Sequence, residues 1–414
     1  MQIQVPYGKE HIAVDIDEKN VSQIVHPNPV ESGDEKTILQ HALSHPVNSE
    51  TFDQFTANAE DLLFIVNDAT RPTPTPKILE VIYDKIKNRN IKFIVATGIH
   101  RAPTEEEFQF IFGKYYEEFK DRIYVHNSKK DEDMVHIGNS KNGTEMWVNK
   151  MGVEAHKLVP VGSVEPHYFA GYTGGRKSFL PGIASYRTIE QNHRYALRPE
   201  ARALALEGNP VHEDMIDALR TIKNKEIFSI QTVLDRERRI YAASAGHIHD
   251  SFLAAISKAN DVFCVKIKEK VDIVVSVAPY PMDVDLYQSQ KALENGKLAL
   301  KDGGILIMVS KCRTGIGDPV FFKLLSNCKT PEETLETIDK GYKLGYHKAA
   351  KMAEIATWAE MWGVTDLPDE TMNSVFIKPF HNIQEAVDKA LKIKGSDAKA
   401  LFLMDGSITV PRIL

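Results

Sequence analysis

The chain has 414 residues, a length that fits two or three domains better than one small core. Hydrophobic residues make up 43% and charged residues 26%, which is the mixture of an ordinary globular protein. A net charge of −6 argues against a nucleic-acid partner, and no apolar run reaches the length that spans a membrane.

Cysteine usage and the N-terminal segment indicate where the protein works. The three cysteines, Cys264, Cys312 and Cys328, are far apart and never spaced CxxC, so neither a disulfide framework nor a zinc knuckle is expected. The N-terminal segment MQIQVPYGKEHIAVDID alternates like a strand and lacks an apolar targeting core. A cytoplasmic protein with three buried, unpaired thiols is the expectation.

The first regular elements predict a βαβ unit. LLFIV at 62–66 is expected to be a buried strand, and a helix follows with Thr75 as N-cap and Pro76 as its first residue. IKFIVATG at 91–98 is the next strand, and a capping box at 104–107 begins another helix. Polar loops, NDATRPTP and TGIHRAP, follow the two strands. Because ligands of open α/β sheets bind beyond the carboxyl ends of strands, these loops are candidate site loops.

A second α/β cycle begins near residue 271, after the charged break KIKEK. Strands are expected at 271–279 and 303–310 and in the C-terminal segments SVFIKPF and KALFLMDG, with helical segments such as 331–363 between them. Trp358 and Trp362 are interpreted as part of a buried helical stripe in that segment. The predicted fold is two α/β domains, 1–269 and 270–414, with largely parallel sheets and a cleft between them.

The segment AGYTGGRKS at 170–178 brings three glycines up to Lys177. A Walker loop requires glycine directly before its lysine, but Arg176 occupies that position and no buried strand leads into the loop, so a nucleoside triphosphatase is disfavoured. Gly174 and Gly175 would still allow a ligand to approach the backbone closely, and exposed amides would suit a single phosphate. A surface turn with a solvated Arg-Lys pair explains the same residues equally well.

Three of the fifteen histidines stand out by position. His100 follows the second strand at the predicted ligand edge, and His167 lies just before the glycine turn. Two imidazoles in one cleft would be suited to moving protons at neutral pH. His193 lies in a short predicted helix, and one histidine cannot form a zinc site unless another molecule supplies the remaining ligands.

Two further groups of polar residues are candidates for substrate binding. Asp68 and Arg71 lie three residues apart in DATRP, and the planar guanidinium matches a carboxylate. The alternative is an Asp-Arg pair that only holds the turn. Tyr287, Gln288 and Lys291 share a helical face after the strand at 271–279, where the alternative is a solvated helix start.

Together these motifs resemble the nickel-dependent lactate racemase family. DATRPTP, ATGIHRAP, EPHYFAGYTGGRK, NHR and LYQSQK occur in that family's order and approximate spacing, across both predicted domains. Lys177 lies ten residues after His167 and sixteen before His193, as the family pattern requires. The resemblance predicts an isomerase that acts on lactate or a related short-chain 2-hydroxy acid.

The resemblance implies a nickel-pincer nucleotide as cofactor, a pyridinium-3-thioamide-5-thiocarboxylic acid mononucleotide that holds Ni(II). Lys177 would form the thioamide that anchors it, with Asp68, Gly174 and Gly175 beside it. His193 would be the protein's one nickel ligand, since two sulfurs and a pyridine carbon complete a near-planar centre. The enzymes that synthesise the cofactor would be partners that supply it.

The reaction that the family implies is racemisation by reversible transfer of the Cα hydride. His100 and His167 would act as acid and base on the hydroxyl of the two enantiomers, and Arg71 would bind the substrate carboxylate. Tyr287, Gln288 and Lys291 would orient the substrate, while Asp68 would orient Arg71, a histidine or the cofactor. Two alternatives remain open: a non-catalytic carrier of the nucleotide, and a phosphate-binding hydrolase that uses the loop GYTGGRKS.

Overall fold

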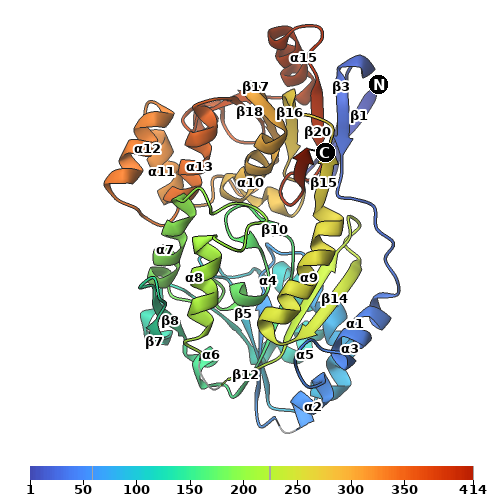
Figure 1. Cartoon of the computed structure of the whole chain (residues 1–414), viewed down its shortest axis with the longest axis vertical. Coiled ribbons are helices and arrows are strands. Elements are labelled where there is room, and N and C mark those ends of the chain that lie inside the picture. Colours follow the sequence, from blue (N-terminus) through green and yellow to red (C-terminus); the bar gives the residue numbers. More distant parts are fainter. Residues whose placement is uncertain (58, 223–224, 414) are drawn as a thin grey trace. The chain divides into compact units, whose positions relative to one another are not determined.

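The computed structural model describes residues 1–57, 59–222 and 225–413 and divides into two compact units (Figure 1). The central unit is Pro29–Val262, and the terminal unit combines Met1–Asn28 with Phe263–Leu414. Each unit contains a largely parallel sheet with helices connecting its strands, which confirms the predicted α/β fold class. None of the helices in these described ranges is long and apolar enough to cross a membrane.

The central unit is built on a sheet of strand order β14-β13-β9-β4-β5-β6, with β12 also paired to β9. All of its pairs are parallel except β13 with β14. The strands are β4 (Leu62–Asn67), β5 (Ile91–Ala96), β6 (Ile123–Val125), β9 (Lys157–Ser163), β12 (Glu226–Ile227), β13 (Ser229–Leu234) and β14 (Ile240–Gly246). Two hairpins lie outside the sheet: β7 (Met134–Asn139) with β8 (Glu145–Asn149), and β10 (Pro166–His167) with β11 (Gly171–Tyr172).

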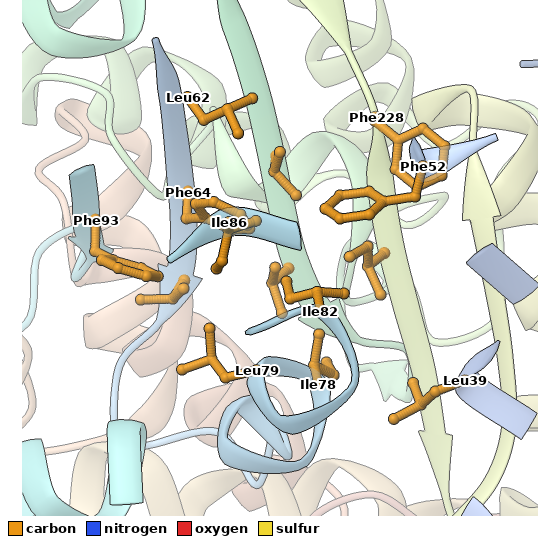
Figure 2. Packing of buried hydrophobic residues seen from close by; sticks show 14 of the residues in the cluster. Leu39, Phe52, Leu62, Phe64, Ile78, Leu79, Ile82, Ile86, Phe93 and Phe228 are labelled. Carbon is orange, nitrogen blue, oxygen red and sulfur yellow. The ribbon is translucent and has the colours of Figure 1, made fainter. Parts of the chain in front are cut away.

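Helices α1 to α5 of the central unit contribute buried apolar side chains to the core of this sheet. The helices of the unit are α1 (Glu35–Ser44), α2 (Phe52–Ala57), α3 (Thr75–Ile86), α4 (Glu105–Phe112), α5 (Tyr116–Phe119), α6 (Lys150–Glu154), α7 (Tyr186–His193), α8 (Pro210–Leu219) and α9 (Ile248–Phe263). Figure 2 shows the apolar side chains of α3 turned toward Phe64 and Phe93 of the sheet, and Phe52 beside Phe228. The rings of Phe52 and Phe228 meet edge to face at 5.3 Å. This core fixes β4 and β5, the strands that carry the first candidate loops.

The terminal unit is built on a fully parallel sheet of order β19-β18-β17-β16-β20-β3. The unit also contains a hairpin of β1 and β2 and a two-stranded pair of β15 and β21. The strands of the unit are β1 (Gln2–Tyr7), β2 (Glu10–Asp15), β3 (Val21–Val25), β15 (Cys264–Ile267), β16 (Val271–Val277), β17 (Leu300–Val309), β18 (Glu360–Val364), β19 (Ile377–Phe380), β20 (Ala400–Leu403) and β21 (Val410–Ile413). Its helices are α10 (Leu286–Gly296), α11 (Pro319–Asn327), α12 (Pro331–Lys340), α13 (Tyr346–Ala356), α14 (Asp369–Asn373) and α15 (Ile383–Lys394).

The predicted division into 1–269 and 270–414 requires correction. The segment Met1–Asn28 belongs with the C-terminal part of the chain, because β3 pairs with β20 along the edge of the terminal sheet (Figure 1). Ile3, Val5 and Val14 of the β1-β2 hairpin are buried in that sheet's core. Pairing between strands from opposite ends of the chain leaves no local sequence signal, so a contiguous first domain was the simpler expectation.

Local predictions for the helical segments were confirmed only in part. The capping box at Thr104 and Glu107 is confirmed, whereas α3 begins at Thr75 instead of being capped by it. The segment 331–363 is not one helical stretch, since α12 and α13 are followed by strand β18. Trp362 is therefore a buried strand residue that stacks on Phe380 at 4.7 Å, and Trp358 lies in the turn before the strand. Of the cysteines, Cys312 is buried and the other two are half-buried.

Candidate active site

The candidate residues of the central unit lie after the carboxyl ends of three adjacent strands. Strand β4 has β5 on one side and β9 on the other, and both pairs are parallel and in register up to their ends. Asp68 follows β4, His100 follows β5 by four residues, and the segment of Glu165 and His167 follows β9. Parallel pairing brings these chain ends to one edge of the sheet, as the topological argument predicts.

Asp68 and His100 form an acid-imidazole pair across two of these loops, with the carboxylate buried. The Asp68 Oδ2 is 2.7 Å from the His100 Nδ1, and Thr70 donates to the Asp68 Oδ1 from its hydroxyl at 2.6 Å and its backbone N–H at 3.1 Å. Burial by itself would raise the pKa of Asp68, but His100 and the donated hydrogen bonds hold that pKa below its ordinary value of 3.8. Because the ionised carboxylate can only accept, the His100 Nδ1 carries a proton, and in the neutral imidazole Nε2 has the lone pair.

Arg71 pairs with Glu165 and not with Asp68. Its Nη1 lies 3.2 Å from the Glu165 Oε1, and the Glu165 side chain is only 5% exposed. The turn-holding Asp-Arg pair that the sequence allowed is therefore not formed through the side chains, although the Arg71 N–H does donate to the Asp68 carbonyl at 3.2 Å. Glu165 links the loop after β4 to the loop after β9, and so fixes the guanidinium at the site.

The glycine turn leads from the β10-β11 hairpin into a single 3-10 turn that carries Lys177. Gly174 has a φ of +84°, and a Cβ there would lie 2.5 Å from the Gln231 Oε1. The same oxygen accepts the Gly175 N–H at 3.0 Å. Glycine is thus required by backbone conformation and by close packing, and the Gly175 amide already has a protein partner.

Arg176 is part of the protein interior. It is 1% exposed, donates to the carbonyls of Ala170 at 2.7 Å and Gly174 at 3.3 Å, and stacks on Phe252 at 4.3 Å. Burial lowers its pKa to about 9. The solvated Arg-Lys pair considered from the sequence is therefore wrong: Arg176 braces the turn from inside, and only Lys177 of the pair is partly exposed.

Lys177, His167 and His193 lie around the ring of Phe169. The Lys177 Nζ is 5.6 Å from the ring centroid, and the imidazoles of His167 and His193 contact the ring at 4.6 Å and 5.1 Å. The Lys177 Nζ is also 3.5 Å from the His167 Nε2. The structure thus brings together an amine and two buried imidazoles from three separate elements: the β10-β11 hairpin, the 3-10 turn and α7.

His167 differs from His100 in its hydrogen bonding. The backbone N–H of Ala170 lies 3.3 Å from its Nδ1, and the Lys177 Nζ, whose ammonium form can only donate, lies 3.5 Å from its Nε2. These two donors compete for the single acceptor nitrogen of the neutral imidazole. His100, in contrast, has its Nδ1 against the carboxylate of Asp68.

Tyr287, Gln288 and Lys291 lie together on α10 of the terminal unit. Asp285 caps the N-terminus of this helix, which follows β16 and a turn. All three side chains are buried, which excludes the alternative of a solvated helix start. The Lys291 Nζ donates to the Gln288 Oε1 at 2.7 Å. Lys348 of α13 covers the Tyr287 ring at 3.4 Å and donates to the Tyr287 carbonyl.

Sequence reasoning missed several residues of this arrangement. Three of them each hold a candidate residue or its loop: Glu165, Arg176 and Lys348. None of the three is separated from its partner by a recognisable sequence spacing. The only available signal was that Glu165 and Arg176 lie within the motif EPHYFAGYTGGRK. In the described ranges, His, Cys, Asp and Glu side chains form no group of three that could hold a metal.

The comparisons with known proteins agree with these motifs. The family model of the lactate racemase N-terminal domain matches residues 7–204, and that of the lactate racemase C-terminal domain matches 266–410. The lactate racemase of Thermoanaerobacterium thermosaccharolyticum is 32% identical over 99% of both chains, and that of Lactiplantibacillus plantarum is 32% identical over 98% of both. The solved structure of the lactate racemase apoprotein from T. thermosaccharolyticum covers all of both chains with a TM-score of 0.90. The chain therefore belongs to the lactate racemase family and is an isomerase.

Proposed function

We propose that this isomerase interconverts the enantiomers of lactate or a related short-chain 2-hydroxy acid, with a nickel-pincer nucleotide attached to Lys177. One observation carries the proposal. An amine and two buried imidazoles surround Phe169, and a carboxylate-backed imidazole follows β5, which is separated from β9 by β4 in the same sheet. Racemisation needs proton acceptors for two hydroxyl positions, and His100 and His167 supply them.

The residues present fit such a cofactor. A nucleotide that brings its own sulfur and carbon donors needs only an amine for its tether and one imidazole for its metal, which Lys177 and His193 provide. Both contact the same ring, so one planar group can reach both. When bound, such a group would supply a reversible hydride acceptor for the substrate Cα.

His100 and His167 move the hydroxyl proton. His100 can act as a base, because the Asp68 carboxylate keeps the imidazole proton of His100 on Nδ1. The same carboxylate would stabilise the imidazolium that forms when Nε2 takes a second proton. His167 must first give up its contact with the Ala170 N–H before it can hold protons on both nitrogens. We therefore expect the two enantiomers to be processed with unequal proton-transfer barriers.

The remaining candidates bind and orient the substrate. Arg71, held through Nη1 by Glu165, retains other N–H groups for the substrate carboxylate. Tyr287, Gln288 and Lys291 would orient the substrate, and Asp68 acts on His100. The enzymes that synthesise the cofactor would be the partners that load it onto Lys177.

The test is to produce the chain together with the cofactor-synthesis enzymes. Intact-protein and peptide mass spectrometry should find the added mass on Lys177, and His193→Ala should lose bound nickel while its thermal unfolding stays cooperative. Single enantiomers from a panel of 2-hydroxy acids should then lose optical purity. Full nickel content in His193→Ala would exclude it as the ligand. A loaded protein that racemises no member of the panel would support the carrier alternative.

A further inference from the structure

His193 is connected to a buried chain of hydrogen bonds. Its Nδ1 lies 3.1 Å from the Oδ1 of the neighbouring Asn192. The Nδ2 of Asn192 donates to the Asp214 Oδ2 at 2.8 Å and to the Val211 carbonyl at 3.3 Å. Asn192 and Asp214 are both fully buried. The chain joins the last turn of α7 to α8, and the two helices lie side by side (Figure 1).

The orientation of the Asn192 amide follows from its partners. The Val211 carbonyl can only accept a hydrogen bond, and it faces the same amide atom as the Asp214 carboxyl oxygen. Turning the amide over would place its oxygen against these two acceptor oxygens, with no donor between them, which is costly in a fully buried location. The amide NH2 group therefore faces α8, and its oxygen faces His193.

This orientation determines the tautomer of His193. An amide oxygen cannot donate, so the hydrogen bond at 3.1 Å requires a proton on the His193 Nδ1. In the neutral imidazole, Nε2 then carries the lone pair. Metal-bound histidines in proteins commonly donate their other N–H to an outer partner, which fixes the tautomer and the ring orientation.

Asp214 holds the amide in place. Besides Asn192, its carboxyl group accepts from the Thr144 hydroxyl at 2.8 Å and from the Ser140 hydroxyl. Ser140 and Thr144 belong to the turn of the β7-β8 hairpin, which closes through hydrogen bonds between these two residues. The Asp214 carboxyl group is therefore held by two separate elements, helix α7 and the β7-β8 turn.

We propose that Asn192 and Asp214 are positioning residues that select the Nδ1–H tautomer of His193 and present Nε2 to the nickel. The proposal rests on the proposed function for its metal, but the tautomer itself is a property of the protein without cofactor. Loss of such an outer partner is expected to weaken nickel binding about 10- to 100-fold.

The first measurement needs no variant of Asn192 or Asp214. Apo-protein labelled with 15N-histidine is examined by long-range 1H–15N correlation, with the His193 signals identified by their absence from His193→Gln. We expect a protonated Nδ1 and an unprotonated Nε2 at neutral pH. A protonated Nε2 would overturn the proposal whatever the cofactor does.

The second measurement compares nickel retention in cofactor-loaded proteins. Asn192→Leu keeps side-chain size but cannot accept from His193, so it should lose the tautomer preference and lose nickel to a chelator at about 10- to 100-fold lower concentration. Asp214→Asn should retain both, because its amide oxygen can still face Asn192 while its NH2 group faces the Ser140 hydroxyl. If Asn192→Leu had the tautomer and the nickel affinity of the wild type, the proposed positioning role of Asn192 and Asp214 would be refuted.

Asn149→Leu is the matched control. Asn149 is another buried asparagine of the central unit whose side chain contacts a buried histidine, His126, at 3.3 Å. Its replacement should lower stability without changing nickel retention. If His193→Ala also retains nickel, or Lys177 carries no cofactor, the proposed function fails. The tautomer measurement on the apo-protein still tests by itself whether Asn192 and Asp214 position His193.

Discussion

Asp68→Asn should disable His100 by reversing its tautomer. Thr70 donates twice to the Asp68 Oδ1, so an amide at this position would keep its oxygen there. Its NH2 group would then replace Oδ2, 2.7 Å from the His100 Nδ1. Two donors cannot share a hydrogen bond, and the His100 proton would move to Nε2, the atom that would accept the substrate proton in the proposed reaction.

The expected loss is large because the base itself is removed. General base catalysis contributes about 10²- to 10⁴-fold, so kcat of the cofactor-loaded variant should fall by at least about 10²-fold. Folding should lose about 1.5–3 kcal/mol with the charge-assisted hydrogen bond. Racemisation is followed by polarimetry from each enantiomer separately, with nickel content and the Lys177 adduct measured in the same samples.

A matched control separates catalysis from stability. Asp235 is also buried, accepts from Ser32 at 2.7 Å and pairs with Arg239, and belongs to the β13-β14 turn. Asp235→Asn should lower the melting temperature but leave kcat unchanged. A fully loaded Asp68→Asn protein that racemises at the wild-type rate would refute the assignment of His100 as an acid-base residue oriented by Asp68.

Three further predictions concern pH, the glycine turn and the substrate carboxylate. Burial lowers the pKa of His126 from 6.5 to about 4, so its contribution to the free energy of unfolding of the apo-protein should fall as pH drops from 6.5 to 4, by at most about 3.4 kcal/mol; urea titrations should show a smaller total fall for His126→Gln. Gly174→Ala should destabilise more than Gly208→Ala, since both have positive φ but only Gly174 lacks space for a Cβ, and denaturation midpoints compare them. Arg71→Lys should raise KM about 10-fold or more in steady-state kinetics, because a lysine cannot grip a carboxylate with two parallel hydrogen bonds.

Each of these predictions has a contrary result. A pH profile of unfolding that is identical in the wild type and His126→Gln would show that another group causes the acid limb. Equal losses of stability in the two glycine variants would mean that φ alone, and not the contact with Gln231, sets the cost. An unchanged KM in Arg71→Lys would remove Arg71 from carboxylate binding.

Local sequence patterns were sufficient to identify several central strands of both sheets and the loops that carry Asp68 and His100. β-branched apolar runs mark β4, β5, β16 and β17, because strands buried on both faces need apolar side chains at successive positions. Parallel strands present their carboxyl ends at one edge, so Asp68 and His100 could be placed together before any coordinates. Family motifs with fixed spacing added Lys177, His167 and His193.

The partners of the site residues, in contrast, became known only from the folded chain. Asp68 contacts His100 and not the nearby Arg71, Arg71 contacts Glu165, and Asn192 bridges its neighbour to Asp214. The segment Met1–Asn28 joins the terminal unit through a strand pair that closes a loop of nearly the whole chain. Periodicity and spacing report forces within one element, whereas hydrogen bonds between buried polar groups depend on which elements pack side by side. That packing is a property of the whole chain, and no short segment encodes it.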